Sequence, residues 1–284
     1  MRLRPADPTP RIAVLSAFAE ELAYIRGQVT DPQVVVIHGQ SFTTGRLAGR
    51  DVVLAESGVS MVNAALTAQT AIDQFTVSAL LFSGIAGGVN PDLGIGDVVV
   101  PAQWGEYQEQ VFARAAGAGW STGLRGRPFP NFEMMFPQNV SVFRFDRAAD
   151  SAEERFWFAA DPALLAAARA AAPGAVLERC ALPAVCLDRA PRVALGGNGV
   201  SGPTFVDNAV YRAWVWQTFQ ADALDMESAA AAHVAYTNGV PFLAFRSLSD
   251  LAGGDAGANQ LIVFYRLAAA QAARVLIATI GQMQ

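Results

Sequence analysis

Several short apolar runs in this 284-residue chain are each followed closely by acidic or glycine residues. Residues 221–225 and 241–245 are two such runs, and Glu227 and Asp250 lie a few positions beyond them. A continuous apolar run of this length is typical of a strand buried on both faces of a sheet. In open α/β sheets, ligands bind beyond the carboxyl ends of the strands. We therefore expect both acids to line one pocket, together with the arginine and the serine near Asp250.

Predicted strands alternate with predicted helices along most of the chain. Apolar runs and a hairpin pattern around Gly39-Gln40 predict the strands, whereas amphipathic periodicity and N-capping residues such as Ser60 and Asp161 predict the helices. The predicted strands are 11–17, 34–38, 41–47, 51–56, 78–82, 97–100, 192–196, 221–225 and 241–245, and the predicted helices are 19–29, 60–74, 161–172, 206–218, 227–238 and 260–281. This alternation predicts one α/β domain with a mostly parallel or mixed sheet.

Two stretches depart from the alternation. Residues 1–10 are polar and rich in proline, so we expect a loose tail ahead of a single domain over 11–284. Residues 103–160 are rich in aromatic residues, Met, Gly and Pro and show no clean period. Because so many apolar groups argue against disorder, we interpret 103–160 as an aromatic-rich insertion.

Composition excludes several classes of function. A net charge of −5 without a basic run argues against a nucleic-acid partner. No stretch approaches the roughly 20 apolar residues of a membrane span, so no membrane partner is expected. The two cysteines and two histidines do not form a metal-ligand set, so we expect neither metal nor cofactor. His233, inside a predicted helix, is expected to pack rather than to catalyse.

Cys180 and Cys186 flank Ala-Leu-Pro-Ala-Val, a predicted loop. We expect two unpaired thiols and, because residues 1–10 lack the apolar core of a signal peptide, a cytoplasmic protein. A disulfide is the alternative. It would imply an oxidising compartment, periplasmic or extracellular.

Other strand ends carry chemistry as well. Glu21 follows the first predicted strand, where an acid can compensate a helix dipole or point into the same crevice as Glu227 and Asp250. The glycines at 84, 87 and 88 follow another predicted strand, where they form a turn or let backbone approach a ligand closely. Glu227 and Asp250 could each simply cap a turn, and Arg246 could be a structural ion-pair partner of Asp250.

Six motifs in order carry a resemblance to a known family. They are Ala17-Phe18-Ala19-Glu20-Glu21, Ser83-Gly84-Ile85-Ala86-Gly87-Gly88, Gly94-Ile95-Gly96-Asp97-Val98-Val99-Val100, Ser201-Gly202-Pro203-Thr204-Phe205, Asp225-Met226-Glu227 and Arg246-Ser247-Leu248-Ser249-Asp250. This order resembles the purine nucleoside phosphorylase superfamily, in particular its methylthioadenosine/S-adenosylhomocysteine nucleosidase branch. The resemblance covers 11–102 and 192–280 and leaves 103–160 outside. It implies a three-layer α/β/α domain with a central mixed β-sheet.

The resemblance also implies residue roles. Glu21 would activate water, and Asp250 would protonate the purine at N7 with Ser249 steadying it. The acid that binds the ribose hydroxyls would be Glu227. The other substrate-binding residues would be Met226 under the sugar, Arg246 nearby, Phe205 and Val206 at the base, and Phe18, Ile85, Ala86 and Gly87.

The expected function is hydrolysis of the N-glycosidic bond of 5′-methylthioadenosine or S-adenosylhomocysteine, with release of adenine. Family phosphorylases place an arginine-bearing loop after the first strand. Here Glu20-Glu21 would repel phosphate, so water is the favoured nucleophile and a phosphorylase the alternative. The nucleosidase branch usually dimerises, so we expect a homodimer, in which segment 129–136 either walls a partner's 5′ pocket or packs as loop core or dimer contact.

Two positions depart from the nucleosidase pattern. Ile85 stands where Ser or Thr is usual, and Asp225 stands where Glu is usual. A similar Gly-Ile-Ala-Gly pattern is found in plant vegetative storage proteins of this superfamily. A catalytically weak nucleoside-binding or storage relative is therefore a further alternative.

Overall fold

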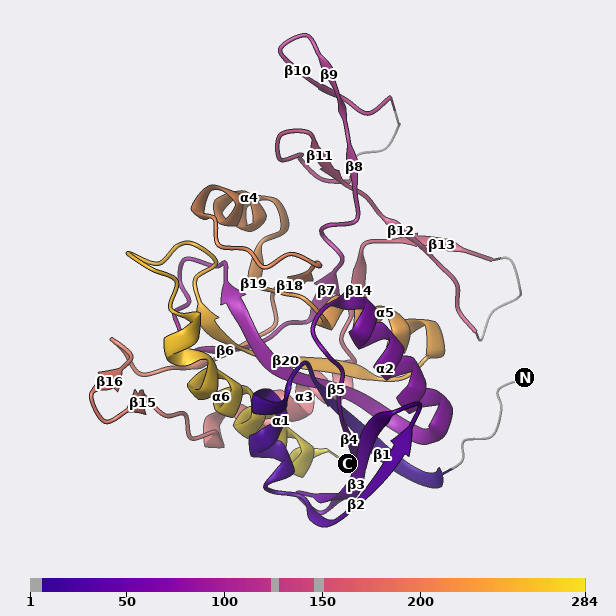
Figure 1. Cartoon of the computed structure of the whole chain (residues 1–284). Coiled ribbons are helices and arrows are strands. Elements are labelled where there is room, and N and C mark those ends of the chain that lie inside the picture. Colours follow the sequence, from indigo (N-terminus) through magenta and orange to yellow (C-terminus); the bar gives the residue numbers. More distant parts are fainter. Residues whose placement is uncertain (1–6, 124–127, 146–150, 284) are drawn as a thin grey trace.

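The computed structural model describes residues 7–123, 128–145 and 151–283, and a single mixed sheet of twelve strands runs through its centre (Figure 1). The helices are α1 (Ala19–Arg26), α2 (Met61–Gln74), α3 (Pro162–Ala171), α4 (Ala209–Phe219), α5 (Ser228–Asn238) and α6 (Leu261–Gln282), with a short 3₁₀ turn at Ala172–Gly174. The strands of the central sheet are β1 (Asp7–Ser16), β2 (Thr30–Ile37), β3 (Gln40–Leu47), β4 (Arg50–Glu56), β5 (Phe75–Gly88), β6 (Val98–Val100), β7 (Gln103–Gly105), β14 (Trp157–Ala159), β17 (Val193–Leu195), β18 (Asn198–Ser201), β19 (Ala221–Asp225) and β20 (Phe242–Asp250).

Helices cover both faces of this sheet. One face packs under α2 and α5, with Ala68, Phe82 and Ala231 in a common core. The opposite face packs under α1, α3 and α6, with Leu22 and Leu276 among the buried residues. This layering confirms the predicted α/β/α fold class. Each central strand reads as a continuous apolar run because both of its faces are buried.

Strand β5 organises the sheet. Its first part pairs in parallel with β1 on one side, and its middle pairs in parallel with β20 on the other. At its far end, Gly87 and Gly88 pair with β19, which runs antiparallel. Strand β19 is therefore antiparallel to β5 and β20 in this mixed sheet, yet Glu227 and Asp250 line one cavity as expected. The carboxyl end of β19 reaches back along β5.

Several element boundaries differ from the predicted ones. Residues 7–10 belong to β1 rather than to a loose tail, and residues 1–6 lie outside the described residues. The glycines at 84, 87 and 88 lie inside β5 rather than after it. Ser60 precedes α2 but makes no side-chain capping bond, whereas Asp161 accepts from the N–H groups of Ala163 and Leu164 at 2.9 and 3.0 Å.

The segment 103–160 is partly sheet and partly hairpins. Its first and last strands, β7 and β14, pair with each other and belong to the central sheet. Between them are β8 (Gln110–Phe112), β9 (Arg114–Ala116), β10 (Gly119–Ser121), β11 (Met135–Pro137), β12 (Val140–Val142) and β13 (Glu153–Arg155). Figure 1 shows β9 and β10 extending away from the sheet. Phe129 and Phe132 instead pack on α4, with ring centroids 4.9 Å from Phe219 and 5.0 Å from Tyr211.

The two cysteines are paired, not free. Cys180 and Cys186 form a disulfide across a small hairpin of β15 (Cys180–Leu182) and β16 (Val185–Cys186). The predicted loop is a hairpin because its two ends pair with each other. The expectation of unpaired thiols is therefore wrong, and the alternative pairing holds.

Helix α6 is long and apolar enough to cross a membrane by length and composition alone. It has 22 residues, and an 18-residue stretch of it has a mean hydropathy of 1.6. Half of that stretch is buried, and residues such as Leu267 and Leu276 pack against the rest of the protein, as in the core helix of a globular domain. Within the ranges that the structure describes, no three His, Cys, Asp or Glu side chains gather as a metal site.

Candidate active site

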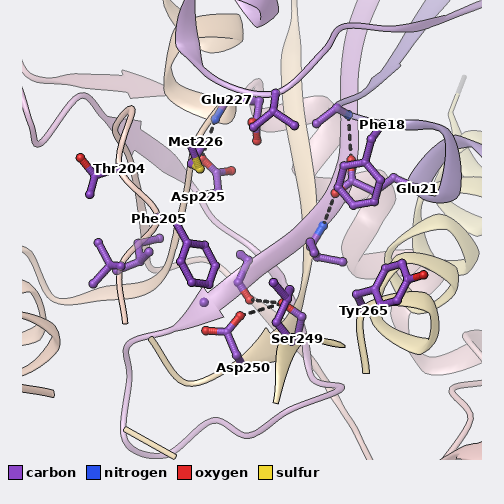
Figure 2. Close-up of a pocket in the computed structure, with 18 of the residues that line it drawn as sticks. Phe18, Glu21, Thr204, Phe205, Asp225, Met226, Glu227, Ser249, Asp250 and Tyr265 are labelled. Atoms are coloured by element: carbon purple, nitrogen blue, oxygen red, sulfur yellow. Dashed lines mark hydrogen bonds between the residues drawn. The ribbon is translucent and has the colours of Figure 1, made fainter. Parts of the chain in front are cut away.

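A cavity of about 380 Å³ opens where β1, β5, β19 and β20 meet (Figure 2). Eleven of the twelve predicted site residues line it, and Arg246 lies behind the lining. The residues around the cavity are Ala17, Phe18, Glu21, Val59, Ile85, Ala86, Gly87, Thr204, Phe205, Val206, Leu224, Asp225, Met226, Glu227, Ser249, Asp250, Leu261, Ile262 and Tyr265. The volume falls in the usual range for small-molecule pockets.

One edge of β5 is left without a strand partner beside the cavity. Strand β1 pairs with β5 only as far as Phe82, and β19 joins only at Gly87. In this gap the N–H of Ile85 donates to Glu21 Oε1 at 2.7 Å, and its carbonyl accepts from Arg246 at 3.0 Å. Because buried backbone groups must be paired, these two side chains replace a strand. Their positions are therefore fixed by the sheet.

The turn from β1 into α1 holds Glu21 from the other side. The N–H of Ala17 donates to Glu21 Oε2 at 2.7 Å, and the residue is 1% exposed. Gly84 makes this approach possible, because a Cβ there would lie 2.4 Å from both Glu21 Oε1 and Arg246 Nη1. The sequence predicted that the backbone at these glycines comes close to another group. At Gly84 that group is not a ligand but the side chains of Glu21 and Arg246.

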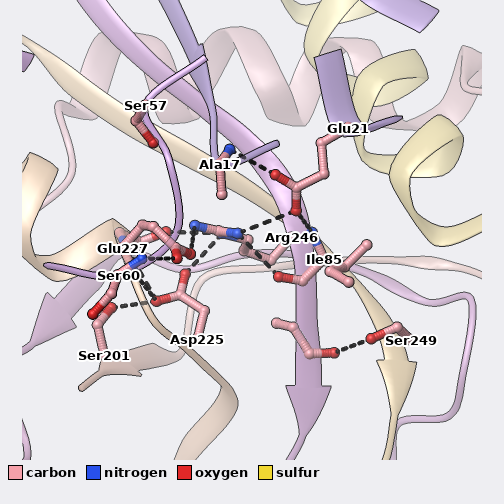
Figure 3. Close-up of polar contacts among 12 residues, drawn as sticks. Ala17, Glu21, Ser57, Ser60, Ile85, Ser201, Asp225, Glu227, Arg246 and Ser249 are labelled. Atoms are coloured by element: carbon pink, nitrogen blue, oxygen red, sulfur yellow. Dashed lines mark hydrogen bonds and ion pairs between the residues drawn. The ribbon is translucent and has the colours of Figure 1, made fainter. Parts of the chain in front are cut away.

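Arg246 is the shared partner of three carboxylates (Figure 3). Its guanidinium lies 2.7 Å from Asp225, 3.2 Å from Glu227 and 3.8 Å from Glu21, and it stacks over the ring of Phe82. The Arg246 side chain is 1% exposed, so little water screens its charge from the three carboxylates, and its interactions with them are strong. None of its described ion pairs is with Asp250, the structural partner that the sequence suggested.

Glu227 immediately precedes α5, but its side chain does not cap the helix. Its side chain accepts from the N–H of Ser60 at 2.7 Å and pairs with Arg246. The first turn of the helix is capped instead by Asp225, which accepts from the N–H groups of Glu227 and Ser228. The carboxylate of Glu227 is therefore free of the helix terminus and faces the cavity (Figure 2).

Asp250 lies at the opposite side of the cavity, as the last residue of β20. One of its oxygens accepts from Ser249 Oγ at 2.9 Å and the other from the N–H of Ala252 at 2.8 Å. The Ser249 hydroxyl also contacts the carbonyl of Ala86. Asp250 thus has neutral partners, in contrast to the acids around Arg246.

Burial sets the protonation of these acids. Burial raises the pKa of Glu21 to about 7, although Arg246 opposes the rise and Glu227 adds to it. Burial also raises the pKa of Glu227, with Arg246 opposing, and that of Asp250, with the Ala252 N–H and Ser249 hydroxyl opposing. Carboxyls in two different environments can divide acid and base tasks.

Apolar side chains form much of the remaining wall. Phe205 is 52% exposed at the mouth, and Met226 and Phe18 lie nearer the acids (Figure 2). Sequence reasoning missed the first turns of α6, where Ile262 and Tyr265 line the cavity. Nothing in the sequence near Ile262 and Tyr265 indicates that they reach the cavity. They follow the glycine-rich residues 251–260, and no periodicity predicts the path of that stretch.

Two other predicted features lie away from the cavity. His233 packs in α5 as expected: its ring stacks on Phe158 with centroids 4.6 Å apart, and Nδ1 lies 2.9 Å from Glu106. None of residues 129–136, all described, lines the cavity of its own chain. They pack mainly against the aromatic residues of α4.

A family model described as the phosphorylase superfamily matches residues 11–281. The chain belongs to the phosphorylase superfamily. The predicted resemblance is confirmed, and the match runs through 103–160, which the motifs had left outside.

Relatives in this superfamily point to one branch. The 5′-methylthioadenosine/S-adenosylhomocysteine nucleosidase of Marinomonas sp. (strain MWYL1) is 33% identical over 243 residues, which is 85% of this chain and 86% of that protein. The corresponding nucleosidase of Mycobacterium bovis is 29% identical over 266 residues, 94% and 95% of the two chains.

Solved structures agree with this grouping. The nucleosidase from S. pneumoniae with the transition-state inhibitor MT-ImmA has a TM-score of 0.72 and 25% identity, and covers 96% of this chain and 100% of that one. The nucleosidase from Neisseria meningitidis in complex with methylthio-immucillin-A has a TM-score of 0.70 and 26% identity, over 95% and 98%. Both carry nucleoside-like inhibitors, as their names state.

The superfamily departure at Ile85 has a local structural basis. The polar contacts at this position come from the backbone N–H and C=O, which any residue provides. Replacing a hydroxyl with an apolar side chain therefore leaves Glu21 and Arg246 in place. It removes one polar group from the cavity wall.

The pKa of Glu21 predicts a pH-dependent stability. Between its ordinary value of 4.5 and about 7, the folded protein binds more protons at Glu21 than the unfolded chain does, so stability falls as pH rises through this window. Glu21→Gln removes this dependence. From about pH 5 to about pH 8, we expect the unfolding free energy of the variant to gain on the order of 2–3 kcal/mol relative to wild type, measured by urea denaturation.

The exposed neighbour supplies a matched control. Glu20→Gln should track the wild type across the same pH range, because Glu20 is exposed in the structure. A difference between Glu21→Gln and wild type that stays constant with pH would show that burial does not raise the pKa of this carboxyl.

Proposed function

We propose that the protein hydrolyses the N-glycosidic bond of a purine nucleoside with an apolar 5′ group, of the methylthioadenosine/S-adenosylhomocysteine class, and releases adenine. One observation carries this proposal. Two buried carboxyls, Glu21 and Asp250, face one apolar cavity from different polar environments. A base for water and an acid for the leaving group are what this cleavage needs.

The geometry suggests how the residues act. As the bond between ribose and purine breaks, positive charge develops on the sugar and negative charge on the base. In its protonated form, which burial favours by raising its pKa, Asp250 donates its proton to N7 of the leaving purine. Ionised Glu21 removes a proton from the water that attacks the anomeric carbon. Glu227 accepts hydrogen bonds from the ribose hydroxyls, and its nearby negative charge stabilises the cationic sugar.

The charge balance supports water rather than phosphate as the nucleophile. A phosphate site needs cations with free donors. Among the described residues around the cavity there is no arginine, and Arg246 behind them is already paired with three carboxylates. A phosphate in the cavity would face Glu21, Asp225 and Glu227 at close range.

The apolar wall supports an apolar 5′ substituent. Val59, Ile262 and Tyr265 are among the residues that line the cavity, and each offers an apolar surface for such a group. Curated and solved relatives are named for 5′-methylthioadenosine and S-adenosylhomocysteine, whose 5′ positions carry thioethers.

An assay with several nucleosides tests the proposal. Methylthioadenosine, adenosine and inosine are each incubated with the protein, with and without phosphate, and free base and sugar are measured. We expect adenine and free methylthioribose without phosphate, and faster turnover of methylthioadenosine than of adenosine. A strict phosphate requirement would establish a phosphorylase instead. Binding without turnover of any nucleoside would favour a storage or nucleoside-binding role.

A substitution at Asp250 tests the assigned acid. Asp250→Asn keeps the shape but supplies no acidic proton, so we expect turnover of methylthioadenosine to fall about 10²- to 10⁴-fold, with affinity within about tenfold. Hydrolysis of a p-nitrophenyl riboside, whose leaving group needs no proton, should change far less. The exposed Asp92→Asn serves as control. Equal losses with both substrates would contradict the role.

We also propose a homodimer whose contact covers the region beside the cavity mouth. Three apolar side chains are exposed there: Val59 at 47%, Val62 at 79% and Leu66 at 65%, the latter two on α2. Val59 itself lines the cavity, so a partner docked on this surface would also close part of the site. Segment 129–136 of the partner is a candidate for that contact.

Charge on this surface should separate the subunits. Val62→Glu combined with Leu66→Glu should give a monomer by light scattering and a raised KM for methylthioadenosine, because the apolar contact is lost. Val176→Glu changes an equally exposed valine, 74% exposed, outside α2 and should leave both properties unchanged. A variant that keeps the wild-type mass would place the dimer contact elsewhere.

A further inference from the structure

We propose that Asp225 is a positioning residue that fixes three parts of the site at once: the loop that carries Phe205, the ribose-facing acid Glu227, and the guanidinium of Arg246. The inference rests on the proposed nucleosidase function and deepens it. Asp225 lines the cavity at its edge, yet it is 5% exposed and its contacts are mostly with the protein.

The carboxylate of Asp225 accepts hydrogen bonds at one oxygen and forms an ion pair at the other. Oδ1 accepts from the N–H groups of Glu227 at 3.1 Å and Ser228 at 3.2 Å, and from the hydroxyl of Ser201. Oδ2 forms an ion pair with Arg246, 2.7 Å from Nε, and the Nε hydrogen itself is donated to Ser228 Oγ at 3.0 Å. A single buried group therefore joins the end of β18, the start of α5 and the middle of β20 (Figure 3).

The contact with Ser201 reaches the base side of the cavity. Ser201 ends β18, and Thr204, Phe205 and Val206 of the following loop line the cavity. The Asp225 backbone holds the same loop, because its carbonyl accepts from the N–H of Gly202 at 3.1 Å. Ser201 Oγ in turn accepts from the N–H of Ala229 in α5 at 2.8 Å. The loop that presents Phe205 is thus tied to the helix that follows Glu227.

Through Arg246, Asp225 is connected to Glu21, the acid proposed to activate water. Arg246 Nε faces Asp225, whereas its Nη atoms face Glu227, Glu21 and the carbonyl of Ile85. The guanidinium is planar and rigid, so the ion pair with Asp225 and the hydrogen bond from Nε to Ser228 Oγ together fix the directions of the other two nitrogens. Asp225 therefore orients the cation between the two working carboxylates without contacting the reacting atoms.

The charge of Asp225 also limits how strongly Arg246 acts on its neighbours. The charged or titratable groups that face this network are Glu21 from α1, Glu227 before α5, Arg246 from β20 and the hydroxyl of Tyr107. If Asp225 were neutral, Arg246 would be shared by two carboxylates instead of three. The pKa of both Glu21 and Glu227 would then fall, because Arg246 lowers each and Asp225 raises that of Glu227.

Two substitutions separate charge from shape. Asp225→Asn keeps the acceptor for Ser201, Glu227 and Ser228 but places an amide beside Arg246. Asp225→Glu keeps the charge but adds a methylene in a buried site. As a control, Asp222→Asn removes a carboxylate three residues earlier on β19, whose partner is Asn90 rather than an arginine.

Carboxyl ¹³C NMR on glutamate-labelled protein measures the pKa of Glu21, whose resonance is identified by its absence in Glu21→Gln. We expect Asp225→Asn to lower this pKa by at least about half a unit, and Asp225→Glu and Asp222→Asn to leave it in place. In parallel, kcat/KM for methylthioadenosine should fall about tenfold or more in Asp225→Asn, and its acidic limb should move to lower pH.

The outcomes are distinguishable from failure of the proposed function. The wild type alone tests whether nucleosides are hydrolysed, whereas the NMR titration reads Asp225 in protein with or without turnover. An unchanged Glu21 pKa in Asp225→Asn would overturn the proposal, even with lost activity. So would an equal shift in Asp225→Glu, which would assign the effect to packing. A shift confined to Asp225→Asn would establish it.

Discussion

The candidate site depends on a few residues of β5 that have no strand on one side. Backbone groups that are buried in a sheet need partners, and here a carboxylate and a guanidinium provide them at Ile85. The pairing fixes Glu21 and Arg246 to the rigid centre of the fold rather than to a mobile loop. Gly84 is required next to them because any side chain there would occupy the same space.

The site around this part of β5 contains more acidic than basic side chains. Glu21, Asp225, Glu227 and Asp250 surround the cavity, and Arg246 is the cation among them. Buried charges without compensation are costly, so part of this set must hold protons near neutral pH. Burial raises the pKa of Glu21, Glu227 and Asp250, which is consistent with that requirement. Asp250, with neutral partners, and Glu21, which shares Arg246 with other acids, are then able to gain and lose protons.

The layers of the fold were predictable because they depend on local patterns, whereas most of the eleven lining residues were predicted through the resemblance to the superfamily's motifs. Apolar runs, helical periodicity and the capping side chain of Asp161 are local signals. The direction of β19 is not local: a short apolar run looks the same whether it pairs in parallel or antiparallel. For the same reason the sequence did not show that β5 continues through its glycines, or that Arg246 lies behind the cavity instead of in it. The helix of Ile262 and Tyr265 was predicted, but their place at the cavity was missed because it depends on the path of residues 251–260, which shows no periodicity.

Ile85 shows how a departure from the family pattern can fit the remaining site. The backbone of Ile85 makes the hydrogen bonds to Glu21 and Arg246, so these contacts do not need a hydroxyl on its side chain. An apolar side chain beside Glu21 attracts less water than a hydroxyl would, and burial is the largest cause of the raised pKa of that acid. A carboxylate with a higher pKa is a stronger base once ionised. In the proposed mechanism, the isoleucine would therefore exchange one hydrogen-bond partner of the attacking water for greater basicity of Glu21.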